Sequence, residues 1–199
     1  MESQLLTTVR DSALTCHTQV STTLGDNNDI NDEVIHQLRV QTKRLRAYWE
    51  LLHPCVGKAH VKSATKELGN ASSRFGAARD HHVMVQLLGK LVGKAKKPKL
   101  QSALADTLKV LTDLPAATTS SSDTLPTGDD VAKTWQRDRR RWESIDARPD
   151  SDSQGNHSVG EGLQRIFKKA RKLHQRAIVE NDIERCHDLR KWVKYLSLI

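Results

Sequence analysis

Hydrophobic residues recur at intervals of three and four positions along most of the chain, which is the spacing of one face of an α-helix. Sustained alternation of hydrophobic and polar residues, the pattern of half-buried strands, is missing from the sequence. The spacing predicts helices near residues 3–23, 32–53, 58–74, 78–95, 99–113, 131–145, 160–180 and 184–198. Segments 115–130 and 146–160 are rich in Pro, Gly, Ser and Asp and are predicted loops. We therefore expect an all-α helical bundle.

The longer loop divides the predicted helices into two groups. A length of 199 residues fits one domain or two small halves that pack closely. We expect a single domain over residues 1–199, with a first helical half at 1–114, a linker at 115–130 and a shorter second half at 131–199.

Basic residues are in excess, and the excess lies outside the N-terminal region. The chain has 32 Lys and Arg against 24 Asp and Glu, and its hydrophobic share of 37% is low. Residues 1–33 hold Arg10 as their single base among several acids. A basic body of this kind attracts anionic partners, and charge alone leaves nucleic acid, an acidic membrane and a phosphate polymer as alternatives.

The cysteines and the N-terminal sequence together predict the cellular compartment of the protein. Cys16, Cys55 and Cys186 are odd in number and far apart, which favours a reducing environment over a disulfide scaffold. The N-terminal sequence lacks the pattern of a secretion signal, and no apolar run approaches the roughly 20 residues that span a bilayer. We expect a cytoplasmic protein without a membrane span.

An internal repeat is the most informative feature of the sequence. Residues 35–45 and 186–196 share the pattern H-x-L-R-x-x-x-K-x-L. On a helix, the first copy places four basic side chains within about 80° of one another. We call them the first basic stripe: His36, Arg39, Lys43 and Arg46. The hydrophobic side chains fall on the opposite side of the same helix: Leu38, Leu45, Trp49 and Leu52.

The second copy repeats the arrangement in a weaker form. Its basic face, the second basic stripe, consists of His187, Arg190 and Lys194. The predicted packing face consists of Leu189, Val193 and Leu196. Such stripes can be ordinary solvated faces of amphipathic helices. Residues 34–49 contain no acid, however, so no carboxylate within this stretch offsets the like charges along the helix, and an anionic ligand would relieve their repulsion.

A third basic helix is predicted over residues 162–177. One face carries Arg165, Lys168, Lys169, Lys172 and Arg176. The other face carries Leu163, Ile166, Phe167, Ala170 and Ala177. A membrane-surface or calmodulin-target helix is an alternative, but the modest apolar face favours a packed helix within the domain.

A further basic segment lies between the two predicted loops. Trp135 and Trp142 flank several arginines there, but Asp138 and Glu143 stand among the bases. The arginines could extend a binding groove, but this mixture favours a solvated helix that packs its tryptophans.

Four segments together resemble the CHAD family, the conserved histidine α-helical domain. Residues 34–52 look like its first signature helix, 68–88 like its second signature, 162–177 like its later basic helix, and 186–196 like a second copy of the first. The resemblance implies two pseudo-symmetric helical bundles around a basic groove that binds inorganic polyphosphate. The ligand-facing positions it implies are His36, Arg39, Lys43, Arg44, Arg46, Arg79, Arg165, Lys169, Lys172, His187, Arg190, Lys191 and Lys194. Spacing alone adds Arg74 and Lys168.

The sequence departs from the family pattern at its C-terminal end. Family domains usually continue for several helices beyond the second histidine helix, whereas this sequence stops at Ile199. Tyr195 and Ser197 replace the counterparts of Arg44 and Arg46. We therefore expect a shortened second half, with a groove that is half built, completed by a second copy in a homodimer, or lost with a truncated gene product.

The expected function is binding of inorganic polyphosphate without catalysis, with no metal or cofactor and a possible association with polyphosphate granules. RNA binding through the same surface is one alternative, although exposed aromatic residues for base stacking are few. A metal-dependent phosphohydrolase is another, for which the candidate residues are His81, His82, His187 and Asp188. No Walker loop and no HExxH motif supports it.

Overall fold

The computed structural model describes residues 5–25, 32–73, 76–113, 128–145, 152–180 and 182–199. Every regular element in these ranges is a helix, which confirms the all-α prediction. The helices are α1 (Leu5–Gly25), α2 (Asp32–Leu51), α3 (His53–Val56), α4 (Lys58–Ser73), α5 (Gly76–Lys94), α6 (Pro98–Asp113), α7 (Gly128–Glu143), α8 (Asp152–Glu180) and α9 (Ile183–Leu196). The division into two pseudo-symmetric halves stays a prediction.

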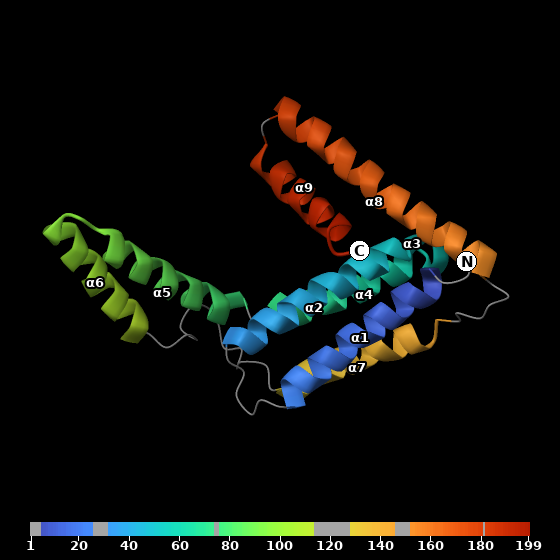
Figure 1. Cartoon of the computed structure of the whole chain (residues 1–199), viewed down its shortest axis with the longest axis horizontal. Coiled ribbons are helices and arrows are strands. Elements are labelled where there is room, and N and C mark those ends of the chain that lie inside the picture. Colours follow the sequence, from blue (N-terminus) through green and yellow to red (C-terminus); the bar gives the residue numbers. More distant parts are fainter. Residues whose placement is uncertain (1–4, 26–31, 74–75, 114–127, 146–151, 181) are drawn as a thin grey trace.

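The core lies among α1, α2, α4 and α7, which run side by side in Figure 1. Leu38 and Leu45 of α2 are fully buried, as the repeat predicts. They meet Ala13 of α1 and Leu68 of α4, which are also fully buried. The packing face predicted for the first histidine helix is therefore confirmed. Because opposite sides of α2 differ so sharply in polarity, burying this face keeps the basic side of α2 out of the apolar core.

A buried carboxylate joins three of the core helices. Asp138 of α7 is 1% exposed. Its Oδ1 accepts a hydrogen bond from Nε1 of Trp49 at 2.9 Å, and its Oδ2 lies 3.0 Å from Nε2 of His17 and 3.2 Å from Nε1 of Trp142. The tryptophans of this helix are buried, as predicted, but the acid among its bases is a core residue and not a solvated one.

The helix α8 begins earlier than its sequence predicts. We expect a loop over 146–160, yet α8 starts at Asp152 and its Val159 is buried. Gly162 allows α8 to cross the end of α2 at close range. A Cβ added at this position would overlap the carbonyl oxygen of Leu51. Packing against α1, α2 and α3 stabilises a helical segment whose composition favours a loop. The predicted linker at 115–130 lies outside the described residues as far as 127, and α7 begins at Gly128.

Two helical hairpins extend from this core in different directions (Figure 1). The α8–α9 hairpin rests on α2 through the N-terminal part of α8 and the C-terminal end of α9. The α5–α6 hairpin packs mainly on itself and meets α2 near the start of α5. No residue of α6 is buried. No helix in the described part of the chain combines the length and hydrophobicity needed to cross a bilayer.

Candidate anion-binding site

The first basic stripe follows the side of α2 that is turned away from α1. His36 is exposed, and Arg39, Lys43 and Arg46 are half-buried. Nη1 of Arg39 donates a hydrogen bond to the backbone carbonyl of Ser72 in α4 at 3.4 Å. The stripe is therefore held against the neighbouring helix at one point, while its histidine stands in solvent.

Arg46 lies where α2, α4 and α9 meet. Its Nη1 is close to Gly69 of α4, since an added Cβ there would lie 3.7 Å away. The guanidinium of Arg46 also lies near the hydroxyl of Tyr195 in α9. Burial raises the pKa of this hydroxyl above its ordinary value, and the positive charge of Arg46 partly offsets the rise. Nε of Arg46 is buried without a hydrogen-bond partner among the described residues, so this guanidinium still has donor capacity.

Three cations surround the ring of Trp192, and we call this group the Trp192 cluster. Nζ of Lys169 lies 4.5 Å from the ring centroid, and Nζ of Lys191 and Cζ of Arg165 each lie 5.8 Å from it. Trp192 itself is 4% exposed, whereas both lysines are exposed. Cation–π attraction holds the two ammonium groups beside a buried ring without neutralising their charge.

Arg165 differs from the two lysines because it has an acidic partner. Its Nη1 and Nη2 each donate a hydrogen bond to Oε2 of Glu50 at 3.0 Å. The pair joins α8 to the end of α2 and is half-buried, with 32% of the Arg165 side chain and 14% of the Glu50 side chain exposed. The positive charge of Arg165 is therefore largely neutralised by Glu50, in a contact that joins two helices. Glu50 directly follows the acid-free residues 34–49, and sequence reasoning gave it no role.

The second basic stripe is exposed along α9. His187, Arg190 and Lys194 lie about 80–140° around the helix from Tyr195, the residue that contacts α2. The second stripe therefore lies on a side of α9 other than the one that meets α2 at Tyr195. Whether the two stripes serve one ligand stays a prediction.

The packing faces predicted for α8 and α9 are partly wrong. On α9 the buried residues are Trp192 and Tyr195, and Val193 is 50% exposed. On α8, Ile166, Ala170 and Ala177 are buried as predicted, but Leu163 is 45% and Phe167 54% exposed. On α9 the physical reason is the size of the aromatic rings: burying Trp192 and Tyr195 removes more apolar area from water than burying Val193, so the aromatic side faces inward.

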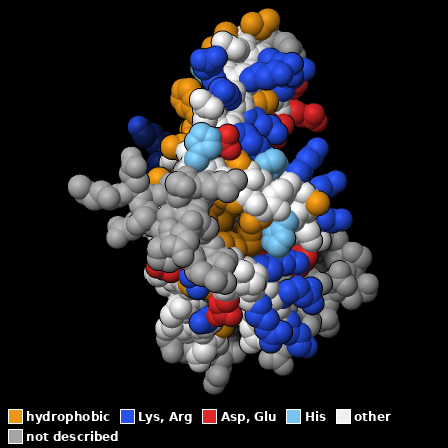
Figure 2. Space-filling view, turned by 90° about the vertical axis from the view of Figure 1, so that its right-hand side faces the viewer, with side chains coloured by type: hydrophobic (Ala, Val, Ile, Leu, Met, Phe, Trp, Pro, Cys, Tyr) orange, Lys and Arg blue, Asp and Glu red, His pale blue; other side chains and the backbone are white. Residues whose placement is uncertain are grey.

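The remaining lysines of α8, Lys168 and Lys172, are exposed. They continue the basic surface of the α8–α9 hairpin, which forms the upper part of the face in Figure 2. On that face Lys and Arg side chains spread widely, and Asp and Glu appear singly among them. Neither lysine is among the described cations that contact the ring of Trp192.

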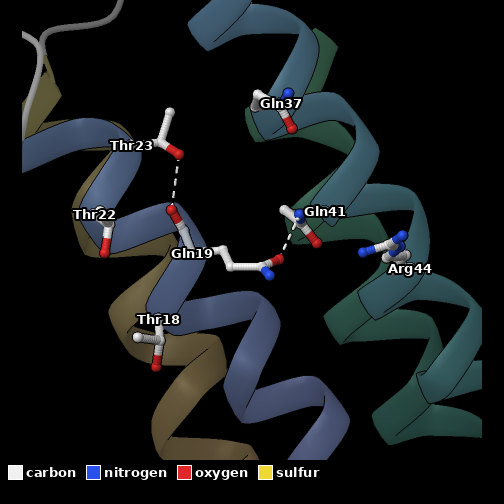
Figure 3. Close-up of a pocket in the computed structure, with 7 residues that line it drawn as sticks. All are labelled: Thr18, Gln19, Thr22, Thr23, Gln37, Gln41 and Arg44. Atoms are coloured by element: carbon white, nitrogen blue, oxygen red, sulfur yellow. Dashed lines mark hydrogen bonds between the residues drawn. The ribbon is translucent and has the colours of Figure 1, made fainter.

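Arg44 lies on another side of α2, facing α1. It lines a shallow hollow of about 450 Å³ with polar, uncharged side chains (Figure 3). The hollow is lined by Thr18, Gln19, Thr22, Thr23, Gln37, Gln41 and Arg44. A hydrogen bond of 2.7 Å from Gln41 to Gln19 crosses between the helices beside it. The structure thus separates Arg44 from the first basic stripe.

Two of the predicted site residues cannot be placed. Arg74 lies outside the described residues, and Arg79 belongs to α5 but its side chain is not among those described. The same holds for His81 and His82 of the phosphohydrolase alternative. Across the described part of the chain, no group of three or more His, Cys, Asp or Glu side chains could hold a metal ion.

The fold and this surface define a class, an all-helical domain that carries a histidine-led row of cations on a core helix. The family model of the CHAD domain matches residues 16–198, and the chain belongs to the CHAD family. No curated protein and no solved structure matches the chain. Family membership confirms the resemblance found in the sequence, while the ligand roles of individual residues stay predictions.

Proposed function

We propose that this CHAD domain binds inorganic polyphosphate on the surface where the first basic stripe meets the Trp192 cluster, and that it does not hydrolyse the polymer. CHAD domains are associated with polyphosphate-related ligands. The observation that carries the proposal is the junction at Arg46, where the stripe on α2 reaches α9 beside Lys191. Cations from helices far apart in the sequence adjoin there.

A linear polyphosphate suits such a surface because its charges are regularly spaced and carry no sequence. Successive turns of a helix present side chains about 5.4 Å apart, so the stripe can meet neighbouring phosphates without a fixed register. Arg46, which lies near Tyr195, offers a forked donor, and Lys169 and Lys191 offer movable point charges. Arg165 acts as a positioning residue, because its guanidinium is already bonded to Glu50.

The nearby acids support binding over hydrolysis. Cleavage of a phosphoanhydride generally requires carboxylates or histidines that hold metal ions. Glu50, the acid beside the Trp192 cluster, is engaged by Arg165. His187 and Asp188 are consecutive on α9 and point about 100° apart. We expect no release of orthophosphate when polyphosphate is incubated with the protein and Mg²⁺ or Mn²⁺, and sustained release would contradict this part of the proposal.

Buried aromatic rings favour polyphosphate over RNA. Trp192 and Tyr195, the aromatic residues beside the cations, are each 4% exposed. Base stacking needs an open ring face, which these residues lack. We expect long-chain polyphosphate to displace a single-stranded RNA from the protein, and preferential retention of RNA at equal phosphate concentration would favour the alternative.

The test of binding uses calorimetric titration with polyphosphate at low and high salt. Counterion release predicts that affinity falls at least about tenfold between roughly 50 and 200 mM salt. The double variant Lys169→Gln, Lys191→Gln should weaken binding about tenfold, since two phosphate contacts are lost. The matched control is Lys62→Gln, which removes an exposed lysine of α4. Equal affinities of the wild type, the double variant and the control would place binding elsewhere on the molecule.

A further inference from the structure

The α5–α6 hairpin presents an unpartnered apolar band. Val83, Met84, Leu87 and Leu91 are 44%, 50%, 55% and 43% exposed. At 100° per residue these four side chains fall within about 100° of one another, so they form one continuous strip along α5. Leu100 at the start of α6 is also 51% exposed. Such an exposed apolar strip on a projecting hairpin is typical of a surface that contacts a membrane or another protein.

The end of the same hairpin is strongly basic. Residues 83–105 contain no Asp or Glu. The turn between the two helices and the residues next to it carry exposed lysines: Lys90, Lys94, Lys96, Lys97 and Lys99. Lys90 and Lys94 lie within about 20° of Val83 around α5, and so along one border of the apolar strip.

An apolar strip bordered by lysines without acids matches the interface of an anionic bilayer. Headgroup phosphates can engage the ammonium groups while hydrocarbon side chains enter the boundary between headgroups and acyl chains. Polyphosphate could bind the lysines, but it would leave Leu87 and Leu91 in water. A second copy packed face to face would cover the leucines, but it would bring two sets of uncompensated lysines together.

We propose that the α5–α6 hairpin docks on the surface of membranes that contain anionic phospholipid. The hairpin extends away from the α8–α9 hairpin in Figure 1, so the docked protein would keep the Trp192 cluster facing solution. This docking is independent of polyphosphate binding. Leu87 and Leu91 supply the apolar contact, and the lysines of the turn supply the electrostatic one.

The test measures flotation of the full chain with vesicles. We expect binding to phosphatidylcholine vesicles that contain roughly 30% phosphatidylglycerol, and about tenfold weaker binding to phosphatidylcholine alone. Lys96→Glu with Lys97→Glu should lower the affinity for anionic vesicles about tenfold, and Leu87→Gln with Leu91→Gln by a similar factor. Control variants are Lys109→Glu, an exposed lysine of α6 far from the turn, and Leu163→Gln, an exposed leucine of α8.

Each outcome of this experiment bears on the proposal. Loss of binding in both double variants, with both controls unchanged, supports it. Unchanged vesicle binding after the leucine substitutions would overturn it in favour of a purely electrostatic contact. A wild type that elutes as a dimer in gel filtration, and becomes monomeric on Leu87→Gln, would assign the strip to a second copy and also overturn it. Absence of binding to anionic vesicles at low salt would end it.

Discussion

Removing the carboxylate of Asp138 should destabilise the whole core. This side chain accepts hydrogen bonds from two indole N–H groups and lies against the ring of His17, in a site that is 1% exposed. Asp138→Ala deletes the acceptor and leaves three nitrogen donors without a partner. Asp138→Asn keeps the volume but turns an NH₂ group toward at least one donor, which separates the loss of acceptors from the creation of a cavity.

The magnitude follows from the number of groups left unsatisfied. Each buried donor without an acceptor costs about 1–3 kcal/mol, and breaking a buried charged network costs about 3–5 kcal/mol in total. The free energy of unfolding of a typical domain is about 5–15 kcal/mol. We therefore expect Asp138→Ala to lose about a fifth or more of the stability of the protein, and Asp138→Asn to lose somewhat less.

Urea unfolding followed by circular dichroism provides the assay. With a slope of about 2–3 kcal/mol per molar urea, the Asp138→Ala midpoint should fall by roughly 1.5 M. Glu143→Ala is the matched control, because Glu143 lies one turn and a half away on α7 and its ion pair with Arg139 is exposed on both sides. Midpoints of both Asp138 variants within about 0.3 M of the control would refute the reasoning, because exposed pairs contribute under about 1 kcal/mol.

Three further predictions follow from contacts between helices. Gly162→Ala should destabilise the protein by several kcal/mol or displace α8, since its Cβ meets the backbone of α2, whereas Gly160→Ala has open space and should stabilise the helix by about 0.5–1 kcal/mol in thermal unfolding. Glu50→Gln should lower the free energy of unfolding by about 1–2 kcal/mol and, in calorimetry, tighten polyphosphate binding about threefold, because Arg165 regains an unneutralised charge. Weaker or unchanged binding would contradict a ligand near Arg165. The pKa of Glu67 is lowered, chiefly by a hydrogen bond from an arginine of α7, so its stabilising contribution is present above the unfolded pKa near 4.3 and is lost as pH falls through the folded pKa. The stability difference between wild type and Glu67→Gln should therefore vanish in acid unfolding curves, and a constant difference would exclude this linkage.

Helical periodicity predicts much of this fold, because the sequence of a single helix determines which of its sides is polar and which is apolar. The buried Leu38 and Leu45 and the basic residues opposite them follow from spacing alone. The same spacing wrongly predicts that Val193 and Phe167 are buried. The residues of one helix do not reveal which neighbouring helix packs against it, or on which side. A single large side chain, Trp192, decides how α9 is rotated.

The sequence predicts which types of residue form the candidate site. It predicts less well which of them contact each other across helices. The first basic stripe lies along one side of α2 as predicted. Arg44, which the resemblance adds to the site, lies on another side of α2, beside α1. The contacts of Arg165 with Glu50 and of Arg46 with Tyr195 join residues far apart in the chain. A pattern within one helix cannot reveal such partners. The buried acid Asp138 did leave a signal, since Trp142 follows it by four residues and could reach it across one helical turn.

The position of Asp138 in the chain has a consequence for synthesis on the ribosome. Helices α1, α2 and α4 leave the exit tunnel well before α7, which packs against α1 and α4 and carries the acceptor for His17 and Trp49. Until α7 emerges, α1, α2 and α4 cannot bury the side that α7 covers, and the ring nitrogens of His17 and Trp49 lack the carboxylate of Asp138. A chaperone or a pause in translation just before α7 would therefore affect the yield of native protein more than an equal delay after it.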